Sequence, residues 1–252
     1  MKYVMIIPAK GHSTRLPGKN IKPFCGHPLV AWSIVQGRYA KLVDEVWVST
    51  DSDEVREIAE GYGANVMMRD YEDKEDTPGY VPIANFINRM IWDGNLTRED
   101  KVIARLCTTP TLLPHDTDAA IELAQWMFEK YAIHGITMGA ELRTVSMFRK
   151  VVDGIGRSLP LDCRCENNGD IVQSLAFFGV QTASTLVDDP PYPNGPEIRR
   201  GGEHPLVCYY NVQPWQMQDV DTPEEWEFAE LVAEHYILKG RDMIEVYKNE
   251  NS

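Results

Sequence analysis

The residues best suited to chemistry lie near the amino terminus, in the stretch VMIIPAKGHSTRLPGKNIKP at residues 4–23. Its apolar start is followed by glycines and by four cations, Lys10, Arg15, Lys19 and Lys22. Residues 1–43 contain seven Lys or Arg and no Asp or Glu, whereas the other residues include 18 basic and 38 acidic side chains. Glycines let backbone N–H groups approach a phosphate, and the cations supply positive charge. The stretch therefore predicts a site for an anionic ligand.

The spacing of this stretch excludes two common phosphate loops. A Walker A loop has the pattern G-x4-G-K-[ST], but six residues separate Gly11 from Gly18, and Asn20 follows Lys19. The dinucleotide pattern G-x-G-x-x-G is absent too. The chain is therefore predicted to be neither a P-loop ATPase nor a dinucleotide dehydrogenase. The alternative, a solvated loop without a ligand, is disfavoured by the complete exclusion of acidic residues.

A second candidate group, Asp219 and Asp221, lies in the segment DVDTPEEWEFAE. On a strand, a D-x-D pattern directs both carboxylates to one face, where they suit a hard divalent cation. The alternative is an electrostatic role at the start of the helix that begins beside Pro223.

The overall composition limits the classes of function. A net charge of −13 argues against nucleic-acid binding, which needs a broad basic patch. No apolar run approaches the ~20 residues that span a bilayer, and VMII is too short for a signal-peptide core. Five scattered cysteines are typical of a reducing cytosol, so a cytoplasmic location is expected. Four residues offer zinc ligands, but their spacing favours free thiols and a loop histidine: Cys163, Cys165, His204 and Cys208.

The elements that must position these residues alternate along the chain. Strands are predicted at residues 3–8, 44–50, 64–68 and 101–107, and helices at 28–40, 53–63, 81–92 and 115–131. This succession indicates a mostly parallel α/β sheet with helices on both faces.

The second half of the chain is less regular. Strands are expected at 135–141 and 209–212, and a hairpin-like excursion at about 141–180 is expected to serve dimerisation within a single domain, 1–252. Thr222, Pro223 and Glu225 predict the N-cap, first residue and capping-box acid of a helix through Leu238.

The segment IIPAKGHSTRLPGKNIKPFCGHPLVAWSI resembles the signature of the cytidylyltransferases that activate acidic sugars. These enzymes are the CMP-sialic acid synthetases and the CMP-KDO synthetases, KDO being a deoxy-octulosonic acid. Similar pieces follow in VWVSTDSDEVREIAEGYGANV, in Arg69 with Asp76 and Thr77, in TTP at 108–110 and in DVDTPEEWEFAE. The resemblance covers most of residues 1–114 and 219–234. It implies a three-layer Rossmann-like nucleotidyltransferase fold.

The resemblance also implies roles for individual residues. Lys10, Arg15 and Lys19 would be catalytic cations, and Asp219 and Asp221 would hold Mg²⁺. Arg164 would bind the substrate across the interface of a homodimer. The residues implied to bind the nucleotide are Pro8, Ala9, Lys10, Gly11, Ser13, Arg15, Lys19, Asn20, Arg69, Asp76 and Thr77.

The activity implied is the Mg²⁺-dependent reaction of CTP with a small acidic sugar, which gives a CMP-sugar and pyrophosphate. The chain departs from the family pattern at Thr14, Tyr80 and Thr108, the last standing where the KDO enzymes carry a metal-binding aspartate. Three alternatives stay open: a nucleotidyltransferase with another base or acceptor, a glycosyltransferase with a D-x-D metal site, and a catalytically silent nucleotide-binding protein.

Overall fold

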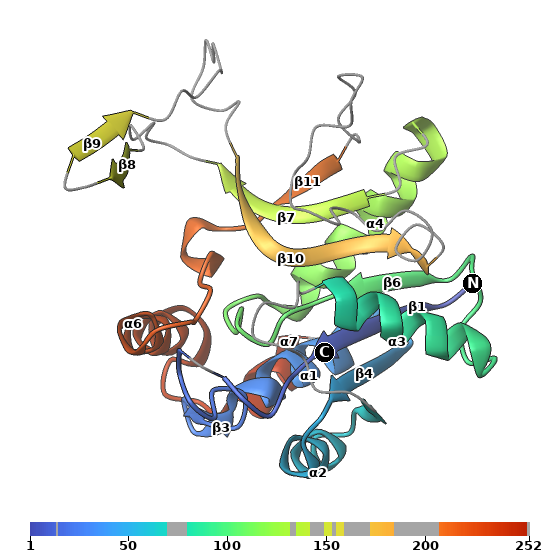
Figure 1. Ribbon diagram of the computed structural model, residues 1–252, viewed down its shortest axis with the longest axis horizontal. Coiled ribbons are helices and arrows are strands. Elements are labelled where there is room, and N and C mark those ends of the chain that lie inside the picture. Colours follow the sequence, from blue (N-terminus) through green and yellow to red (C-terminus); the bar gives the residue numbers. More distant parts are fainter. Residues whose placement is uncertain are drawn as a thin grey trace.

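The computed structural model describes residues 1–13, 15–69, 80–131, 135–141, 149–152, 155–158, 172–183 and 207–250. Within these residues seven strands form one sheet in the order β11-β7-β10-β6-β1-β4-β5 (Figure 1). Its strands are β1 (Tyr3–Pro8), β4 (Glu45–Thr50), β5 (Asn65–Met68), β6 (Lys101–Ala104), β7 (Gly135–Glu141), β10 (Val172–Thr182) and β11 (Val207–Asn211). The α-helices are α1 (Leu29–Tyr39), α2 (Asp53–Gly61), α3 (Tyr80–Trp92), α4 (Pro114–Tyr131), α6 (Pro223–Ala233) and α7 (Met243–Glu250). Shorter elements are β2 (Pro23–Phe24), β3 (His27–Pro28), β8 (Arg149–Val152), β9 (Ile155–Ser158), the 3₁₀ turn η2 (Pro214–Gln216) and the π-helical turn η3 (Glu234–Leu238).

The seven-stranded sheet is parallel except at one strand. β1 pairs in parallel with β4 and β6, β4 pairs in parallel with β5, and β11 does so with β7. β10 lies antiparallel between β6 and β7. The prediction of a mostly parallel α/β sheet is therefore confirmed.

The central strand β1 shows why the sheet has helices on both faces. Its alternate residues Met5 and Ile7 pack into one core with residues of α1, α2 and α4. Val4 and Ile6 point the other way, into a second core formed with α3. All four side chains have no exposed surface, which explains why β1 reads as a continuous apolar run rather than an alternating one.

A further layer covers the side of α1 that faces away from the sheet. There Trp32 of α1 packs edge-on against Phe24 and Tyr247, and Phe24 packs edge-on against Trp226 of α6. This aromatic core joins the amino-terminal third of the chain to α6 and α7. Among the described residues, no helix combines the length and the apolar character that crossing a bilayer requires.

Most predicted elements agree with the structure within a few residues, but two boundaries were wrong. β6 ends at Ala104, so residues 105–107 belong to the turn after the strand rather than to it. β10 was assigned to the excursion at about 141–180, but it pairs on both edges within the central sheet. What the structure describes of that excursion outside the sheet is the antiparallel β8–β9 hairpin.

One glycine in α1 yields a stability test. A Cβ at Gly37 would lie 2.6 Å from Met5 Sδ and 2.9 Å from Val46 Cγ2. We expect Gly37→Ala to lower the free energy of unfolding by about 1–2 kcal/mol, because overpacking outweighs the gain in helix propensity of up to ~1 kcal/mol. Thermal unfolding should show a midpoint lower by roughly 4 °C.

The matched control is Gly61→Ala in α2, where a Cβ would meet nothing within 4 Å. This variant should raise the midpoint slightly, since alanine restricts the unfolded chain. A rise of the thermal midpoint in both variants would contradict the close packing of α1 against β1.

Candidate active site

The loop between β1 and α1 lies at the carboxyl end of β1, where ligands of parallel α/β sheets bind. Its backbone is held against the end of β4. The Ala9 N–H donates to the Ser49 carbonyl at 2.9 Å, and the Gly11 N–H donates to Asp51 Oδ1 at 2.6 Å. A Cβ at Gly11 would lie 2.7 Å from the Cβ of Ser52, so the close approach of the two segments needs glycine at this position.

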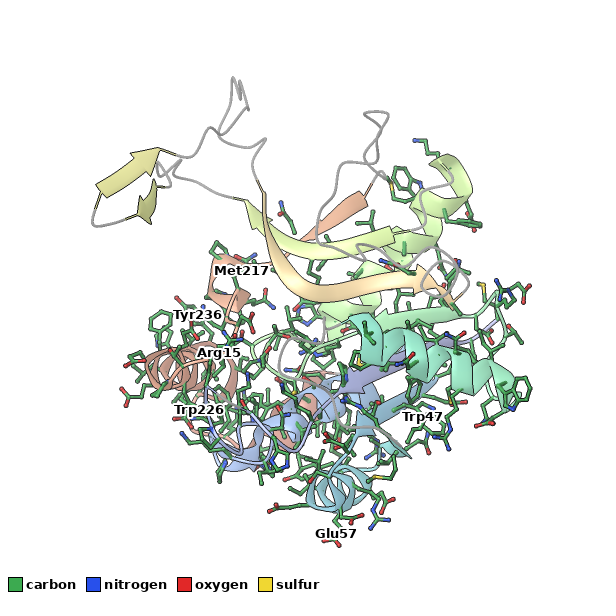
Figure 2. The ribbon with its side chains drawn as sticks, in the orientation of Figure 1. Arg15, Trp47, Glu57, Met217, Trp226 and Tyr236 are labelled. Atoms are coloured by element: carbon green, nitrogen blue, oxygen red, sulfur yellow. The ribbon has the colours of Figure 1, made fainter. Side chains whose placement is uncertain are left out.

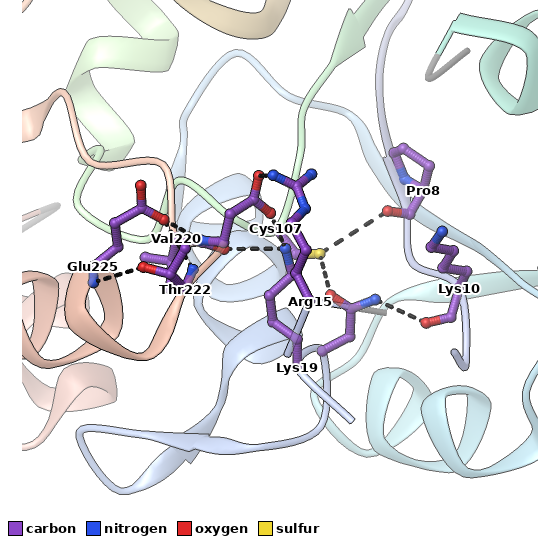
Figure 3. Close-up of polar contacts among 10 residues, drawn as sticks. Pro8, Lys10, Arg15, Lys19, Cys107, Val220, Thr222 and Glu225 are labelled. Atoms are coloured by element: carbon purple, nitrogen blue, oxygen red, sulfur yellow. Dashed lines mark hydrogen bonds and ion pairs between the residues drawn. The ribbon is translucent and has the colours of Figure 1, made fainter. Parts of the chain in front are cut away.

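Asp221 joins this loop to the far end of the chain. Lys19 Nζ donates to Asp221 Oδ1 at 2.6 Å and to the Val220 carbonyl at 3.0 Å, and 202 positions separate Lys19 from Asp221 (Figure 3). Arg15 forms a second ion pair, also 2.6 Å long, with Asp221 Oδ2. The Lys19 side chain is 10% exposed, whereas the Arg15 side chain is 69% exposed and lies on the same side of the molecule as Trp226 of α6 (Figure 2). Two of the four loop cations, Lys19 and Arg15, therefore meet the D-x-D segment at Asp221.

The residues Asp219 and Asp221 do not lie on a strand, contrary to expectation. They belong to an irregular segment between η2 and α6. The alternation that a strand would give is nevertheless kept, because Val220 is fully buried between two half-buried aspartates and its N–H donates to the Thr108 carbonyl at 2.8 Å. The predicted capping box follows directly: Thr222 caps α6 and Glu225 accepts from the Thr222 N–H at 2.9 Å. Glu225 also accepts from the Asp221 N–H at 2.8 Å.

The two aspartates differ in their electrostatic surroundings. Burial raises the pKa of Asp219, and the charge of Asp221 raises it further, while the Thr108 hydroxyl and Lys19 act in the opposite direction. Asp221 has direct contact with two cations, but no ion pair is formed by Asp219 among the described residues. Among the described residues, Asp219 is therefore the aspartate of the pair that forms no ion pair of its own, although the charge of Lys19 acts on it.

Asn20 supports the loop from within. It is 7% exposed, its Nδ2 donates to the Lys10 carbonyl at 2.8 Å, and its Oδ1 accepts from Cys107 Sγ at 2.9 Å. Burial raises the pKa of the Cys107 thiol to about 11, so the thiol keeps its proton at neutral pH and can donate. Asn20 was predicted to bind the nucleotide, and that stays a prediction; in the structure its Nδ2 holds the loop backbone.

The remaining polar side chains of the loop differ in whether they already contact another group of the protein. Within the described part of the chain, the Lys10 ammonium and the Ser13 hydroxyl form no hydrogen bond or ion pair. Lys22 instead lies 4.4 Å from the centroid of the Trp226 ring in a cation–π contact. Lys10 and Ser13 are therefore two polar side chains of the loop that a ligand can reach without breaking a contact among the described residues.

Arg69 lies at the end of β5, beside the loop. Its Nε donates to Ser49 Oγ at 3.0 Å and its second guanidinium nitrogen donates to the Ser49 carbonyl at 2.7 Å. With Ser49, Phe86 and Trp92 it lines an open groove of about 790 Å³. Seven positions named from the sequence lie outside the described residues: Thr14, Asp76, Thr77, Cys163, Arg164, Cys165 and His204.

The donor set fits a magnesium ion that arrives with a nucleotide. Magnesium is usually bound by one or two carboxylates together with phosphates and water. Among the described residues, Asp219 forms no ion pair with a basic side chain, and the buried Thr108 hydroxyl beside it makes no well-formed hydrogen bond. In the part of the chain that the structure describes, no three His, Cys, Asp or Glu side chains form a self-sufficient metal site. Asp219 and Asp221 therefore suit a cation that brings further ligands with it.

Sequence analysis missed three residues beneath the site: Gln36, Arg105 and Cys107. Arg105 and Gln36 are fully buried and bond to each other and to the turn that carries Cys107. The available signal was the arginine inside the apolar run KVIARLC, since a charge at a buried position usually has a partner.

The two aspartates should respond oppositely to neutralisation. Because the pKa of Asp219 is higher in the folded than in the unfolded protein, protonation of this carboxyl stabilises the folded state. That stabilisation is fully present below the pKa of the unfolded state and is lost as the pH rises through the pKa of the folded state. At pH 7 the charged form therefore opposes folding, and Asp219→Asn should raise the thermal midpoint by a few degrees.

Asp221→Asn is the matched variant, because it removes the same negative charge from the same segment. It should lower the midpoint, since buried Lys19 loses its counter-ion. Both variants are measured by thermal unfolding of the ligand-free protein. Equal shifts of the thermal midpoint in Asp219→Asn and Asp221→Asn would contradict the conclusion that the two carboxylates have different electrostatic surroundings.

Comparison with known proteins agrees with this geometry. Residues 4–127 match the family model described as Cytidylyltransferase. An N-acylneuraminate cytidylyltransferase of Oncorhynchus mykiss is 26% identical over 251 residues, which are 96% of this chain and 53% of that protein. A pseudaminic acid cytidylyltransferase of Campylobacter jejuni is 43% identical over 77 residues, which are 30% of this chain and 33% of that protein. The chain thus spans about half the length of the first relative.

The fold also has a solved counterpart. The structure of CMP:2-keto-3-deoxy-manno-octonic acid synthetase complexed with CTP aligns with a TM-score of 0.65 and 19% identity, over 93% of this chain and 99% of that one. This likeness confirms the Rossmann-like nucleotidyltransferase architecture that the sequence predicted. The family match, which covers residues 4–127 and with them the cationic loop, shows that this part of the chain is similar to the cytidylyltransferases.

Proposed function

We propose that the chain is a CTP-dependent nucleotidyltransferase that activates a small acidic sugar to its CMP derivative and releases pyrophosphate. The observation that carries the proposal is the meeting of Lys19 and Arg15 with Asp221, which puts the cationic loop beside the two aspartates. The names of the relatives, which act on N-acylneuraminate and pseudaminic acid, support the choice of base and acceptor class.

The reaction requires positioning and charge neutralisation rather than a covalent intermediate. A sugar hydroxyl oxygen forms a bond to the α-phosphorus and loses its proton to solvent, and the bond from that phosphorus to the oxygen bridging to the β-phosphate breaks, so that this oxygen leaves with pyrophosphate. Lys10, Arg15 and Lys19 would neutralise the negative charge of the triphosphate and of the departing pyrophosphate. The glycine-containing loop would align the phosphates for in-line attack.

Asp219 and Asp221 would hold a magnesium ion, which supplies charge neutralisation at the phosphate oxygens when bound. In the ligand-free arrangement, Asp221 already contacts two cations. Arg15 is the more exposed partner, because its side chain is 69% exposed and that of Lys19 is 10% exposed. Transfer of Arg15 from Asp221 to a phosphate would free one carboxylate oxygen at the time the nucleotide binds.

The remaining roles follow from the family resemblance. We propose that Arg69, Asp76 and Thr77 contact the nucleoside and that Arg164, from the partner copy in a homodimer, binds the acceptor carboxylate. Cys25 and Cys107, which form no disulfide, are compatible with the cytoplasmic location expected from the cysteine content.

The test is a pyrophosphate-release assay of the purified protein with Mg²⁺, each of the four NTPs and a panel of acidic sugars that includes sialic, pseudaminic and octulosonic acids. Release is expected only with CTP and one class of acidic sugar. Asp221→Asn should reduce the rate by roughly 100-fold or more. Tight CTP binding without release for any sugar would favour a silent nucleotide-binding protein, and absence of CTP binding would refute the proposal.

The exchange of Arg15 can be tested by Mn²⁺ binding, measured calorimetrically without nucleotide. Arg15→Met should bind Mn²⁺ several-fold more tightly than the wild type, because Asp221 then has one cation fewer. Arg38→Met is the control, since it removes an equal charge from an exposed arginine whose guanidinium contacts the Tyr62 carbonyl. Equal gains in both variants would show a general charge effect and contradict the exchange.

A further inference from the structure

Arg105 is a charged residue in an apolar setting directly beneath the site. It is the first residue after β6, and its side chain has no exposed surface. Burial lowers its pKa to about 10, so the guanidinium still carries its charge at neutral pH. A buried charge is costly unless it is paired and fully hydrogen-bonded.

The hydrogen bonds of Arg105 satisfy only part of its guanidinium, although the charge of Asp116 favours the charged form. One guanidinium nitrogen donates to Gln36 Oε1 and to the Thr109 carbonyl, the latter at 3.0 Å. The other two nitrogens, Nε and the first terminal nitrogen, have no hydrogen-bond partner among the described residues. Replacing buried ionic groups by apolar residues of similar volume is often neutral or stabilising. The guanidinium therefore needs an explanation other than stability.

Gln36 and Arg105 hold the same turn, residues 106–110. Gln36, in the middle of α1, donates through Nε2 to the Pro110 carbonyl at 2.6 Å and to the Tyr247 hydroxyl at 2.9 Å. With the bond from Arg105 to Thr109, two successive carbonyls of the turn are fixed from inside the protein. The turn cannot shift without breaking buried hydrogen bonds, each of which is expensive to leave unmade.

The opposite side of the same turn contacts the candidate site. The Thr108 carbonyl accepts from the Val220 N–H at 2.8 Å, between the two aspartates, and the Thr108 hydroxyl lies close enough to Asp219 to lower its pKa. Cys107 Sγ contacts Asn20 Oδ1 at 2.9 Å, and Asn20 in turn holds the Lys10 carbonyl (Figure 3). The turn thus connects the buried guanidinium to the metal side and to the loop side of the site.

We propose that Arg105, together with Gln36, is a positioning residue that fixes the 106–110 turn and thereby the place of Asp219 in the metal site. The inference rests on the proposed function, because it assumes that Asp219 and Asp221 bind a cation with the nucleotide. Arg105 itself touches neither the nucleotide nor the metal. Its effect passes through Thr108 and the backbone of Val220.

The test is the Mn²⁺ affinity of the CTP-bound protein, measured by calorimetry and by electron paramagnetic resonance, neither of which requires turnover. Arg105→Met keeps the volume of the side chain and removes its donors. We expect Mn²⁺ to bind about tenfold more weakly, the lower end of the range for groups that orient metal ligands. Binding of CTP without metal should change by less than about threefold, well below the effect on the metal.

Ile103→Val is the matched control, because Ile103 lies in β6, two residues before Arg105, and is fully buried in the apolar core. It should lower the thermal midpoint and leave the Mn²⁺ affinity unchanged. A folded Arg105→Met protein with wild-type Mn²⁺ affinity would overturn the inference. If Arg105→Met does not fold, Gln36→Leu decides the question by the same criterion, since it removes the bond to the Pro110 carbonyl.

Failure of the proposed function gives a different result. In that case the wild-type protein itself would bind no Mn²⁺ in the presence of CTP, and the positioning inference would be refuted with it. Loss of affinity in Arg105→Met against an intact wild type is the outcome that supports the inference.

Discussion

The organisation of the site depends on the two ion pairs that the Asp221 carboxylate forms. This carboxylate pairs with Lys19, which is buried, and with Arg15, which is exposed, and both cations lie about 200 positions earlier in the chain. A buried ammonium ion without a counter-charge would be costly, so the amino-terminal loop is ordered only if the segment before α6 reaches it. The aromatic core between α1, α6 and α7 supplies that proximity. The capping box of α6 then fixes the backbone of Asp221.

The site combines a rigid base with groups that are not fully satisfied. The central strand β1 is packed on both faces, so the start of the cationic loop is held in place. Above it, Asp219 has a pKa raised by burial, and the Thr108 hydroxyl and part of the Arg105 guanidinium lack well-formed partners among the described residues. Such groups reduce the stability of the free protein. They are expected where a charged ligand completes the network on binding.

Much of the fold was predictable from the sequence because its signals are local. β1, α1, β4 and the capping box of α6 have clear apolar runs and cap residues, and the structure agrees with them closely. The central place of β10 was not predictable, since an isolated apolar strand carries no mark of which strands it pairs with. For the site, the resemblance assigned roles to Lys19 and Asp221, and the structure brings the two side chains into contact, while their roles stay predictions. It did not reveal that Asn20 faces the loop backbone or that Arg105 lies beneath the turn, because both depend on contacts between distant segments.

The central claim is that the cationic loop and the D-x-D segment form one site for a triphosphate and its metal. A crystal structure of the protein with CTP and Mn²⁺, phased to locate the manganese by its anomalous signal, tests this most directly. We predict a single strong peak within metal-coordination distance of carboxylate oxygens of both Asp219 and Asp221. The triphosphate should lie against Lys10, Arg15 and Lys19, with the Arg15–Asp221 ion pair broken. Manganese or nucleotide bound elsewhere, with that ion pair intact, would contradict the claim.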